Sequence, residues 1–312
     1  MGILFMTKKL SMNKGTAGAL LCAAGGMCWG LSGSMGQYLF TRQGMDSRWL
    51  VPLRLGLAGV ILFIYCLVRY GRKVAGPLSN RADLLRLIVY GLLGVSTCQF
   101  AYFLCIQLSS AAMGTILQDL SPVFILMVTC IREHRKPLIK EVIAILLAFA
   151  GVLLLATHGS IENLLISMPA IIAGVVSAVC VMIYNCSDRL ISKYPVALLQ
   201  AYSFIAGGIV YSLIFRSWTI HYVPNAAGIF GIVFVVIVGN VLAFTLYIRG
   251  VSYIGPDRGI LYGFLEPVTA AVITVTVFHA KATVFDLVGF ALIFIMLLLI
   301  SRRDEPVGSN CF

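Results

Sequence analysis

The chain has 312 residues, of which 60% are hydrophobic and 11% are charged, and its mean hydropathy is +0.98. These values exclude an ordinary soluble globular protein and indicate an integral membrane protein. The formal net charge of +11 is spread over short connecting segments and is not gathered on one face. The basic residues therefore favour anionic lipid headgroups over nucleic acid as partners.

Ten transmembrane helices are predicted from the runs of residues that lack charge. One crossing needs about 20 apolar residues, so the segment from Leu87 to Ile131 is too long for one helix and is interpreted as two helices joined by a tight turn. The predicted spans, in chain order, are 16–38, 50–69, 85–107, 111–131, 139–157, 167–188, 196–215, 227–249, 256–278 and 284–301. The sequence thus predicts an all-α membrane fold.

The basic residues between the helices predict the orientation. Ten crossings put both termini on one side, and a cytoplasmic placement of the termini also puts the basic segments 69–73 and 132–140 in the cytoplasm. Few basic residues, such as Arg42 and Arg216, then lie outside, which agrees with the positive-inside rule. We therefore expect a multi-pass protein of the inner (cytoplasmic) membrane with a cytoplasmic N-terminus and C-terminus.

The nine cysteines form no C-x-x-C pair, and none falls in a predicted outer loop. Neither a disulfide framework nor a metal site is therefore predicted. We also expect no cofactor.

The sequence contains two similar halves. A gapless alignment of Pro122 with Pro267 also aligns Tyr102 with Tyr247. The predicted domains are residues 15–157, with helices 1 to 5, and residues 162–302, with helices 6 to 10. Because five crossings in each half give the second half the opposite polarity, the two halves are predicted to form an inverted repeat. Inverted repeats recur in secondary transporters, whose substrate site lies near the membrane midplane.

Three charged residues fall well inside predicted helices, away from their ends: Arg54, Asp119 and Glu266. Each costs about 2.5–3.5 kcal/mol at a helix centre, so each is expected to face the bundle interior. Arg54 either forms a buried pair or lies near the surface as a snorkelling side chain. Asp119 is expected to hold helix 4 against a neighbour, with Arg54 as the candidate partner. Structural or gating roles are predicted for Arg54, Asp119, Pro122 and Pro267.

Glu266 is the most informative of these residues. The following Pro267 has no N–H to donate to the carbonyl of Gly263, so it frees backbone acceptors beside the acid. Tyr262 lies one turn earlier on the same face and is predicted to place its phenol next to the carboxylate. Two interpretations remain open. Glu266 binds a cationic group or a coupling proton, or it is a neutral or ion-paired residue that ties helices together.

Aromatic and amide side chains at similar depth predict a site for a small amphipathic organic solute. The candidate substrate-binding residues are Trp29, Gln99, Tyr102, Gln118, Ser121, Tyr184, Asn240, Tyr247, Tyr262 and Glu266. No catalytic residue is predicted.

Several motifs in this order resemble a known family. They are "CWG" at 28–30, an arginine early in helix 2, "LSPVF" at 120–124, "EVIAILLAFAGVLLL" at 141–155 and "LEPVTA" at 265–270. Together they are similar to EamA-type members of the drug/metabolite transporter superfamily, over about residues 15–302. The resemblance implies a central cavity among helices 1–4 and 6–9, with helices 5 and 10 at the periphery and able to contribute to a homodimer. It also implies export of amino acids or other small metabolites without ATP hydrolysis.

One feature departs from the family pattern. Many relatives have a glutamate at the outer end of helix 9, where this chain has His279–Ala280–Lys281, whereas the corresponding acid of the first half, Glu133, is present. A gating role for the second acid is therefore not carried over to this chain.

The leading hypothesis is a secondary transporter that exports a small metabolite through alternating access. The alternative is a polytopic membrane enzyme such as a lipid-modifying transferase, but the four histidines lie at helix ends and no H-x-x-x-D motif occurs. A channel would need a ring of charges or a carbonyl filter, and one chain with a single midplane acid offers neither. A nucleotide-sugar exchanger would need several deep lysines and arginines to bind a diphosphate.

Overall fold

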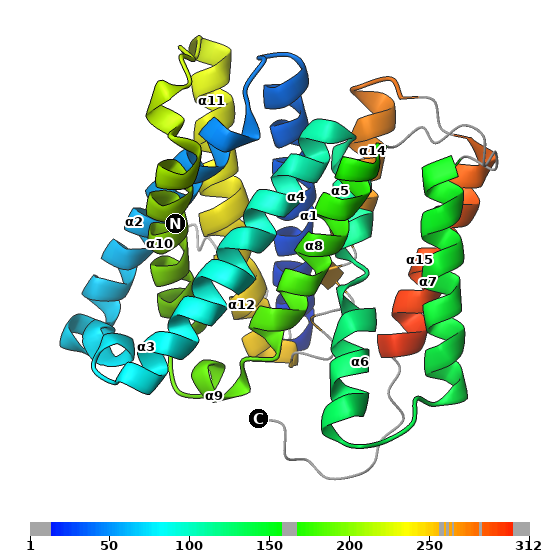
Figure 1. Ribbon diagram of the computed structural model, residues 1–312, viewed down its shortest axis with the longest axis horizontal. Coiled ribbons are helices and arrows are strands. Elements are labelled where there is room, and N and C mark those ends of the chain that lie inside the picture. Colours follow the sequence, from blue (N-terminus) through cyan, green and yellow to red (C-terminus); the bar gives the residue numbers. More distant parts are fainter. Residues whose placement is uncertain are drawn as a thin grey trace, which may run out of the picture.

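The computed structural model describes residues 14–157, 167–255, 259, 262–263, 265–280 and 283–301. Within these ranges every regular element is a helix (Figure 1). The predicted all-α fold is therefore confirmed for the described part of the chain.

The first half of the chain forms a series of helices separated by short connections. They are α1 (Lys14–Thr41), α2 (Ser47–Tyr70), η1 (Gly71–Leu78), α3 (Arg81–Ile88), η2 (Val89–Ser96), α4 (Thr97–Leu108), α5 (Ala111–Gln118), α6 (Ser121–Arg132) and α7 (Ile139–Thr157). The segments α3, η2 and α4 follow one another without a break and form one long helix whose central part is π-helical.

The second half contains a similar series. It consists of α8 (Met168–Asn185), α9 (Asp188–Ile191), α10 (Val196–Phe215), η3 (Ser217–Thr219), α11 (Ala226–Phe234), η4 (Val235–Leu242), α12 (Ala243–Ile254), α14 (Leu265–Thr276) and α15 (Val284–Ser301). Here α11, η4 and α12 again form one long helix with a π-helical centre.

Polar residues fix the starts of several helices. The Asp46 carboxylate accepts a hydrogen bond from the backbone N–H of Arg48 at 2.7 Å, before the first turn of α2. Ser110 accepts from Met113 N at 3.2 Å and starts α5 in the same way. The backbone N–H groups in the first turn of a helix have no carbonyl acceptor within the helix, and each of these side chains supplies one.

In the part of the chain that the structure describes, six helical segments are long and apolar enough to cross a membrane. They are Ser47–Leu78, Arg81–Leu108, Ala111–Arg132, Met168–Asn185, Val196–Phe215 and Ala226–Ile254. The helices Leu265–Thr276 and Val284–Met296 are apolar but shorter. The chain is therefore an integral membrane protein, while the number of ten crossings and the inverted repeat stay predictions.

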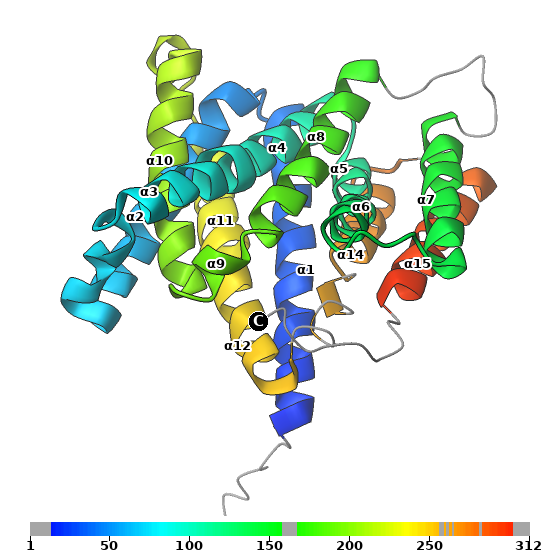
Figure 2. The same ribbon diagram turned by 60° about the horizontal axis from the view of Figure 1, so that its bottom comes forward.

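Helix α1 runs through the middle of the bundle (Figures 1 and 2). It packs against α12, η4 and α14, while α8 packs against α4, η2 and α5, and α2 packs along α10. The close packing of α1 on α14 requires glycine at position 30, because a Cβ on Gly30 would lie 2.7 Å from the Thr269 Cβ. Helices α7 and α15 pack against each other at one side of the molecule, visible in both views.

Candidate functional site

The helix predicted over residues 111–131 is interrupted in its middle. Helix α5 ends at Gln118, residues Asp119 and Leu120 form a turn, and α6 begins at Ser121. Pro122 has no N–H and lies in the first turn of α6, so it cannot donate to the Gln118 carbonyl as a continuous helix would require. The predicted span 111–131 agrees with the apolar segment Ala111–Arg132, and a turn at residues 119–120 interrupts the helix within it. The proline produces a break beside a buried Ser121.

Glu266 and Tyr102 meet between two distant parts of the chain. The Tyr102 hydroxyl donates a hydrogen bond to Glu266 Oε1 at 3.3 Å, so it joins α4 to the first turn of α14. Tyr102 is buried, whereas Glu266 is half-buried and keeps some accessible surface. Tyr262 was predicted to supply the phenol, but the structure assigns this contact to Tyr102, and Tyr262 is a half-buried neighbour in the chain. Pro267 is buried directly after the acid.

Arg54 is buried and does not reach the membrane surface. Only 2% of the residue is exposed. Its Nη2 donates a hydrogen bond to Gln99 Oε1, and its guanidinium carbon lies 3.6 Å from the centre of the Phe103 ring. Gln99 and Phe103 are one turn apart on α4, so a single helix holds the cation through an amide and an aromatic face. This geometry overturns the snorkelling alternative.

Asp119 does not pair with Arg54. Its Oδ2 atom is buried and has no hydrogen-bond partner among the described residues, and Arg54 Nε is also without one. The prediction that an Asp119–Arg54 pair holds helix 4 in place is therefore wrong in this structure. The physical reason is that Gln99 and Phe103 already hold the guanidinium on α4.

Gln118 takes part in a separate contact between α5 and α8. Its Oε1 accepts a hydrogen bond from Ser177 Oγ at 2.7 Å and lies 3.5 Å from Cys98 Sγ. The Gln118 side chain therefore joins α4, α5 and α8 at the level where α5 ends. The sequence pattern predicted Gln118 as a site residue, whereas its partners Ser177 and Cys98 were not predicted.

Aromatic rings of the predicted site form two groups. The Trp29 ring centre lies 5.2 Å from that of Phe244 and 5.0 Å from that of Tyr247. Tyr184 lies 6.2 Å from Tyr90 between ring centres. Trp29, Tyr184 and Tyr247 are half-buried. Asn240, on the π-helical segment η4, is 1% exposed, and its Nδ2 has no partner in the described part of the chain.

An apolar cavity of about 340 Å³ lies between α1, α11 and α14. Met35, Tyr38, Phe230 and Ile273 are among its lining residues. None of the predicted substrate-binding residues lines it. The polar residues around Glu266 are therefore distinct from this apolar cavity.

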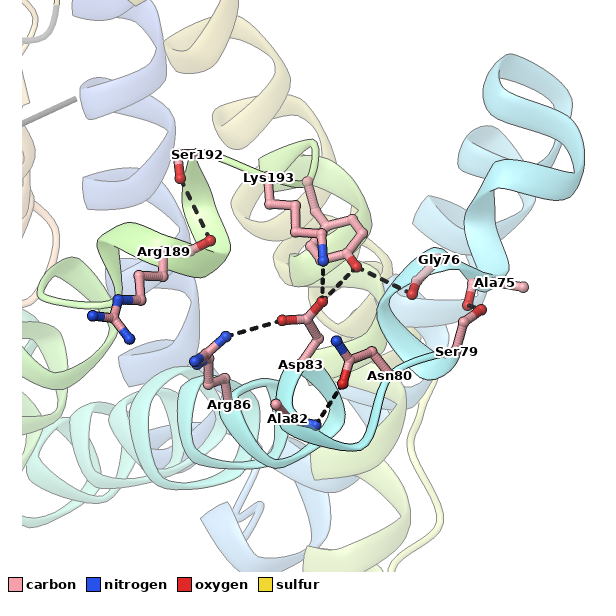
Figure 3. A network of polar contacts seen from close by, with 11 residues as sticks. Ala75, Gly76, Ser79, Asn80, Ala82, Asp83, Arg86, Arg189, Ser192 and Lys193 are labelled. Atoms are coloured by element: carbon pink, nitrogen blue, oxygen red, sulfur yellow. Dashed lines mark hydrogen bonds and ion pairs between the residues drawn. The ribbon is translucent and has the colours of Figure 1, made fainter.

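A polar network that was not predicted joins η1 and the start of α3 to the segment before α10 (Figure 3). The buried Asp83 carboxylate forms an ion pair with Lys193, accepts from the Tyr194 hydroxyl at 2.9 Å and lies 3.1 Å from Arg86 Nη1. The Gly76 carbonyl oxygen lies 3.1 Å from the same Tyr194 oxygen and shares its single hydroxyl proton with the carboxylate. The hydrogen bond with Asp83 raises the pKa of Lys193 above its ordinary value.

Two glutamines, near the ends of α1 and α4, form hydrogen bonds that were not predicted from the sequence. Gln107 Oε1 accepts from the backbone N–H of Ser47, and Gln37 Oε1 accepts from the backbone N–H of Ala111, each at 2.8 Å. They satisfy the free N–H groups at the starts of α2 and α5 from neighbouring helices. Nearby, hydrogen bonds from Arg48 hold the pKa of Asp46 below its usual value.

The chain is similar to membrane transporters over almost its whole length. The model of the EamA-like transporter family matches residues 16–157 and 168–302. The "Uncharacterized inner membrane transporter YicL" of Salmonella typhimurium is 31% identical over 93% of this chain and 96% of its own length. The "Uncharacterized transporter YyaM" of Bacillus subtilis is 27% identical over 80% of this chain and 82% of its own. A crystal structure with 17% identity covers 91% of this chain and 96% of its own, with a TM-score of 0.63, and it shows a shared fold.

Proposed function

This chain belongs to the EamA-like transporter family, and from that premise we propose that it is a secondary transporter for a small metabolite. The transported solute is an amino acid or a similar amphipathic molecule, and the direction is export across the inner membrane. Transport proceeds by alternating access around a central site, with the N-terminus and C-terminus in the cytoplasm. No cofactor is required, because the gradient of the solute or of a coupling ion drives the cycle.

The hydrogen bond between Tyr102 and Glu266 is the observation that carries this proposal. Tyr102 lies in the segment 16–157 and Glu266 lies in the segment 168–302, which are the two matches to the family model. A carboxylate within apolar helices is costly to bury, and such residues mark substrate or ion pathways in membrane proteins. A site at such a junction changes its access when one half moves against the other.

The proposed inverted repeat of residues 15–157 and 162–302 has support from local structure. A π-helical segment interrupts α3–α4 in the first half and α11–α12 in the second. The packing is also reciprocal, because α1 packs on α12 and α14, while α8 packs on α4 and α5. π-helical segments are frequent at functional sites, and here each lies in a helix that contributes to the proposed site.

The side chains around Glu266 suit a cationic group on an apolar body. The carboxylate would bind an ammonium group, and the rings of Trp29 and Tyr247, which pack on each other, offer faces that attract cations and pack against apolar groups. Gln99, Gln118, Ser121, Tyr184, Asn240 and Tyr262 complete the proposed substrate-binding set. Movement at the α5–α6 break, next to Pro122, would open or close this site.

A homodimer through α7 and α15 remains part of the proposal. These two helices pack against each other at one side of the molecule, and their outer faces carry apolar side chains such as Phe149, Leu146 and Leu287. In a membrane the same faces can also contact lipid chains. Cross-linking between two copies in native membranes would support the homodimer, and its absence would indicate that lipid covers these faces.

Counterflow in proteoliposomes tests the proposed function. Vesicles loaded with a mixed panel of amino acids and small metabolites are exposed to labelled members of the panel, and uptake driven by exchange is measured. We expect wild type to accumulate at least one amphipathic member and Glu266→Gln to lose this activity. Asp188→Asn is the matched control, because Asp188 is an exposed acid. A Glu266→Gln variant that exchanges solute at the wild-type rate at every pH would contradict the proposed role.

A further inference from the structure

The apolar cavity between α1, α11 and α14 opens onto the surface of the molecule. Three of its lining residues keep a large exposed fraction: Phe230 on α11 with 63%, Val277 after α14 with 59% and Leu31 on α1 with 37%. Helix α11 is the start of the apolar segment Ala226–Ile254, which is long enough to cross a membrane. An apolar opening on such helices faces the hydrocarbon of the bilayer.

The cavity offers little to a polar ligand. Among its described lining residues, the two with polar side chains are Ser34 and Tyr38. Ser34 Oγ donates to the Gly30 carbonyl at 2.9 Å, and the Tyr38 hydroxyl accepts from Gln43 Nε2 at 3.0 Å. A charged solute would lose its hydration here and gain at most one hydrogen bond, from the Tyr38 O–H. Apolar cavities of about 150 Å³ already stay dry and take apolar ligands, so the occupant of this one, at about 340 Å³, is apolar.

One end of the cavity lies where three helices begin or end. Tyr38 is in the last turn of α1, Ala227 is in the first turn of α11, and Phe278 comes just after the end of α14. These helix ends lie at the top of the view in Figure 1. Because apolar helices end near the headgroup region of a bilayer, this end of the cavity reaches the headgroups.

The rim at this end carries a positive charge. Arg42 N donates to the Tyr38 carbonyl at 2.9 Å, so the backbone stays helical there and places Arg42 on the face of α1 that carries Tyr38. Arg42 is exposed and has no ion-pair partner among the described residues. The described segments 38–45, 223–230 and 273–280 contain no carboxylate, and the nearby Asp46 already pairs with Arg48. The rim therefore attracts an anion.

We propose that this cavity binds one acyl chain of an anionic phospholipid whose phosphate is held by Arg42. The chain would fill the space between α1, α11 and α14, and the guanidinium would bind the phosphate at the headgroup level. The lipid then stabilises the junction of α1 with α14, the helix that carries Glu266. This site is independent of the proposed transport function.

Photolabelling of the full chain in lipid nanodiscs tests the proposal. The nanodiscs consist of phosphatidylcholine with a small fraction of phosphatidylglycerol that carries a photoactivatable diazirine on its acyl chain, and labelled peptides are mapped by mass spectrometry. We expect the label to concentrate on residues 31–38 and 227–234, and excess unlabelled phosphatidylglycerol to remove it. The exposed apolar side chains of α7 and α15 should take less label, which excess lipid does not remove selectively. Even labelling of all these faces would overturn the proposal.

A filled cavity gives a matched comparison. Ala227→Phe places a ring at an exposed lining position and should lower the labelling of residues 31–38 several-fold. Ala226→Phe adds the same ring at an exposed position outside the described lining and should leave the labelling unchanged. Equal labelling in the two variants would overturn the cavity as the binding place. If Ala227→Phe fails to fold, the competition in wild type still decides.

The headgroup contact is tested separately. Arg42→Gln should weaken the competition by phosphatidylglycerol about five-fold, whereas Arg249→Gln, which removes an exposed arginine of α12, should not. Equal competition in both variants would overturn the role of Arg42. Loss of the label on addition of the mixed amino-acid and metabolite panel would assign the cavity to the solute. An unlabelled cavity whose Ala227→Cys variant cross-links two copies would assign it to a second chain. Either result overturns the lipid assignment.

Discussion

Asp83 and Lys193 are 110 residues apart in the chain and form an ion pair between the start of α3 and the segment before α10. Tyr194 extends the contact by binding both the Asp83 carboxylate and the Gly76 carbonyl. The network therefore fastens the η1–α3 connection of the first half to the α9–α10 connection of the second (Figure 3).

This network should stabilise the fold up to alkaline pH. Its hydrogen bond raises the folded-state pKa of Lys193 above the ordinary value of 10.5. Such a group contributes stability that is complete below its unfolded pKa and is lost as pH rises through the folded value. Lys193→Met should lower the thermal-unfolding midpoint at neutral pH, and its difference from wild type should shrink above pH 10.5.

The exposed Lys136 offers a control for this measurement, because Lys136→Met removes a cation of the same type without an ion-pair partner in the described residues. Lys136→Met should leave the midpoint close to that of wild type at neutral pH. A Lys193→Met difference that stays constant through the alkaline range would show that the charge of Lys193 is not what stabilises the network.

The Gln107 side chain should stabilise the start of α2. It supplies the acceptor for the Ser47 N–H at 2.8 Å, and loss of a helix-terminal hydrogen bond costs about 1 kcal/mol. Gln107→Leu should therefore reduce the free energy of unfolding by about that amount. Reversible denaturant unfolding in mixed micelles measures the change.

Gln43→Leu is the matched glutamine substitution. Gln43 donates to the Tyr38 hydroxyl at 3.0 Å and satisfies no helix-terminal group among the described residues. We expect a smaller loss than for Gln107→Leu. Equal losses of unfolding free energy in the two variants would mean that the hydrogen bond to Ser47 N does not stabilise the start of α2.

The cation–π contact of Arg54 with Phe103 should be measurable as a coupling free energy. Phe103→Leu removes the ring face 3.6 Å below the guanidinium, and such desolvated contacts contribute about 1–2 kcal/mol. In the Arg54→Met background the same substitution should cost less, by about 1 kcal/mol. A double-mutant cycle of unfolding free energies tests this. Additive effects would indicate that the ring only fills space.

Hydropathy and proline chemistry predicted the parts of the fold that depend on local sequence. The helices expected at 139–157 and 196–215 have the bounds Ile139–Thr157 and Val196–Phe215. For these two helices, the length of the apolar run is enough to predict the bounds, because polar or charged residues lie at or near both ends of each run. Pro122 signalled lost backbone hydrogen bonds, but a kink and a full break have the same sequence signal, so the turn at 119–120 could not be distinguished in advance.

Partners across the bundle could not be predicted in this way. Arg54 was recognised as a costly charge, but its partners Gln99 and Phe103 depend on which face of α4 meets α2. Tyr262 was chosen for Glu266 because it shares a helix face, whereas Tyr102 reaches the acid from another helix, 164 residues away in the chain. Periodicity gives the facing direction of a residue within one helix and says nothing about what lies opposite.

Thiol labelling tests the orientation that the basic residues predict. Ser79, between η1 and α3, is exposed and should be cytoplasmic, whereas Thr219, after α10, is exposed and should lie outside. A membrane-impermeant maleimide added to intact cells should label Thr219→Cys and spare Ser79→Cys, relative to the unsubstituted chain. Permeabilised cells should label both. The opposite pattern in intact cells would reverse the topology.

The Tyr102 hydroxyl should matter for transport far more than that of Tyr262. Tyr102→Phe removes the donor that lies 3.3 Å from Glu266 Oε1, so the carboxylate loses the group that stabilises its charge. Exchange of the cationic solute should fall about 10-fold or more, since a hydrogen bond to a charged group contributes about 1.5–3 kcal/mol. Tyr262→Phe, which changes the phenol that sequence alone favoured, should lose less activity than Tyr102→Phe, because the hydrogen bond to Glu266 Oε1 comes from Tyr102. Counterflow rates measured across pH at equal protein levels decide between the two tyrosines, and a larger loss in Tyr262→Phe would place the working phenol on the helix of Glu266.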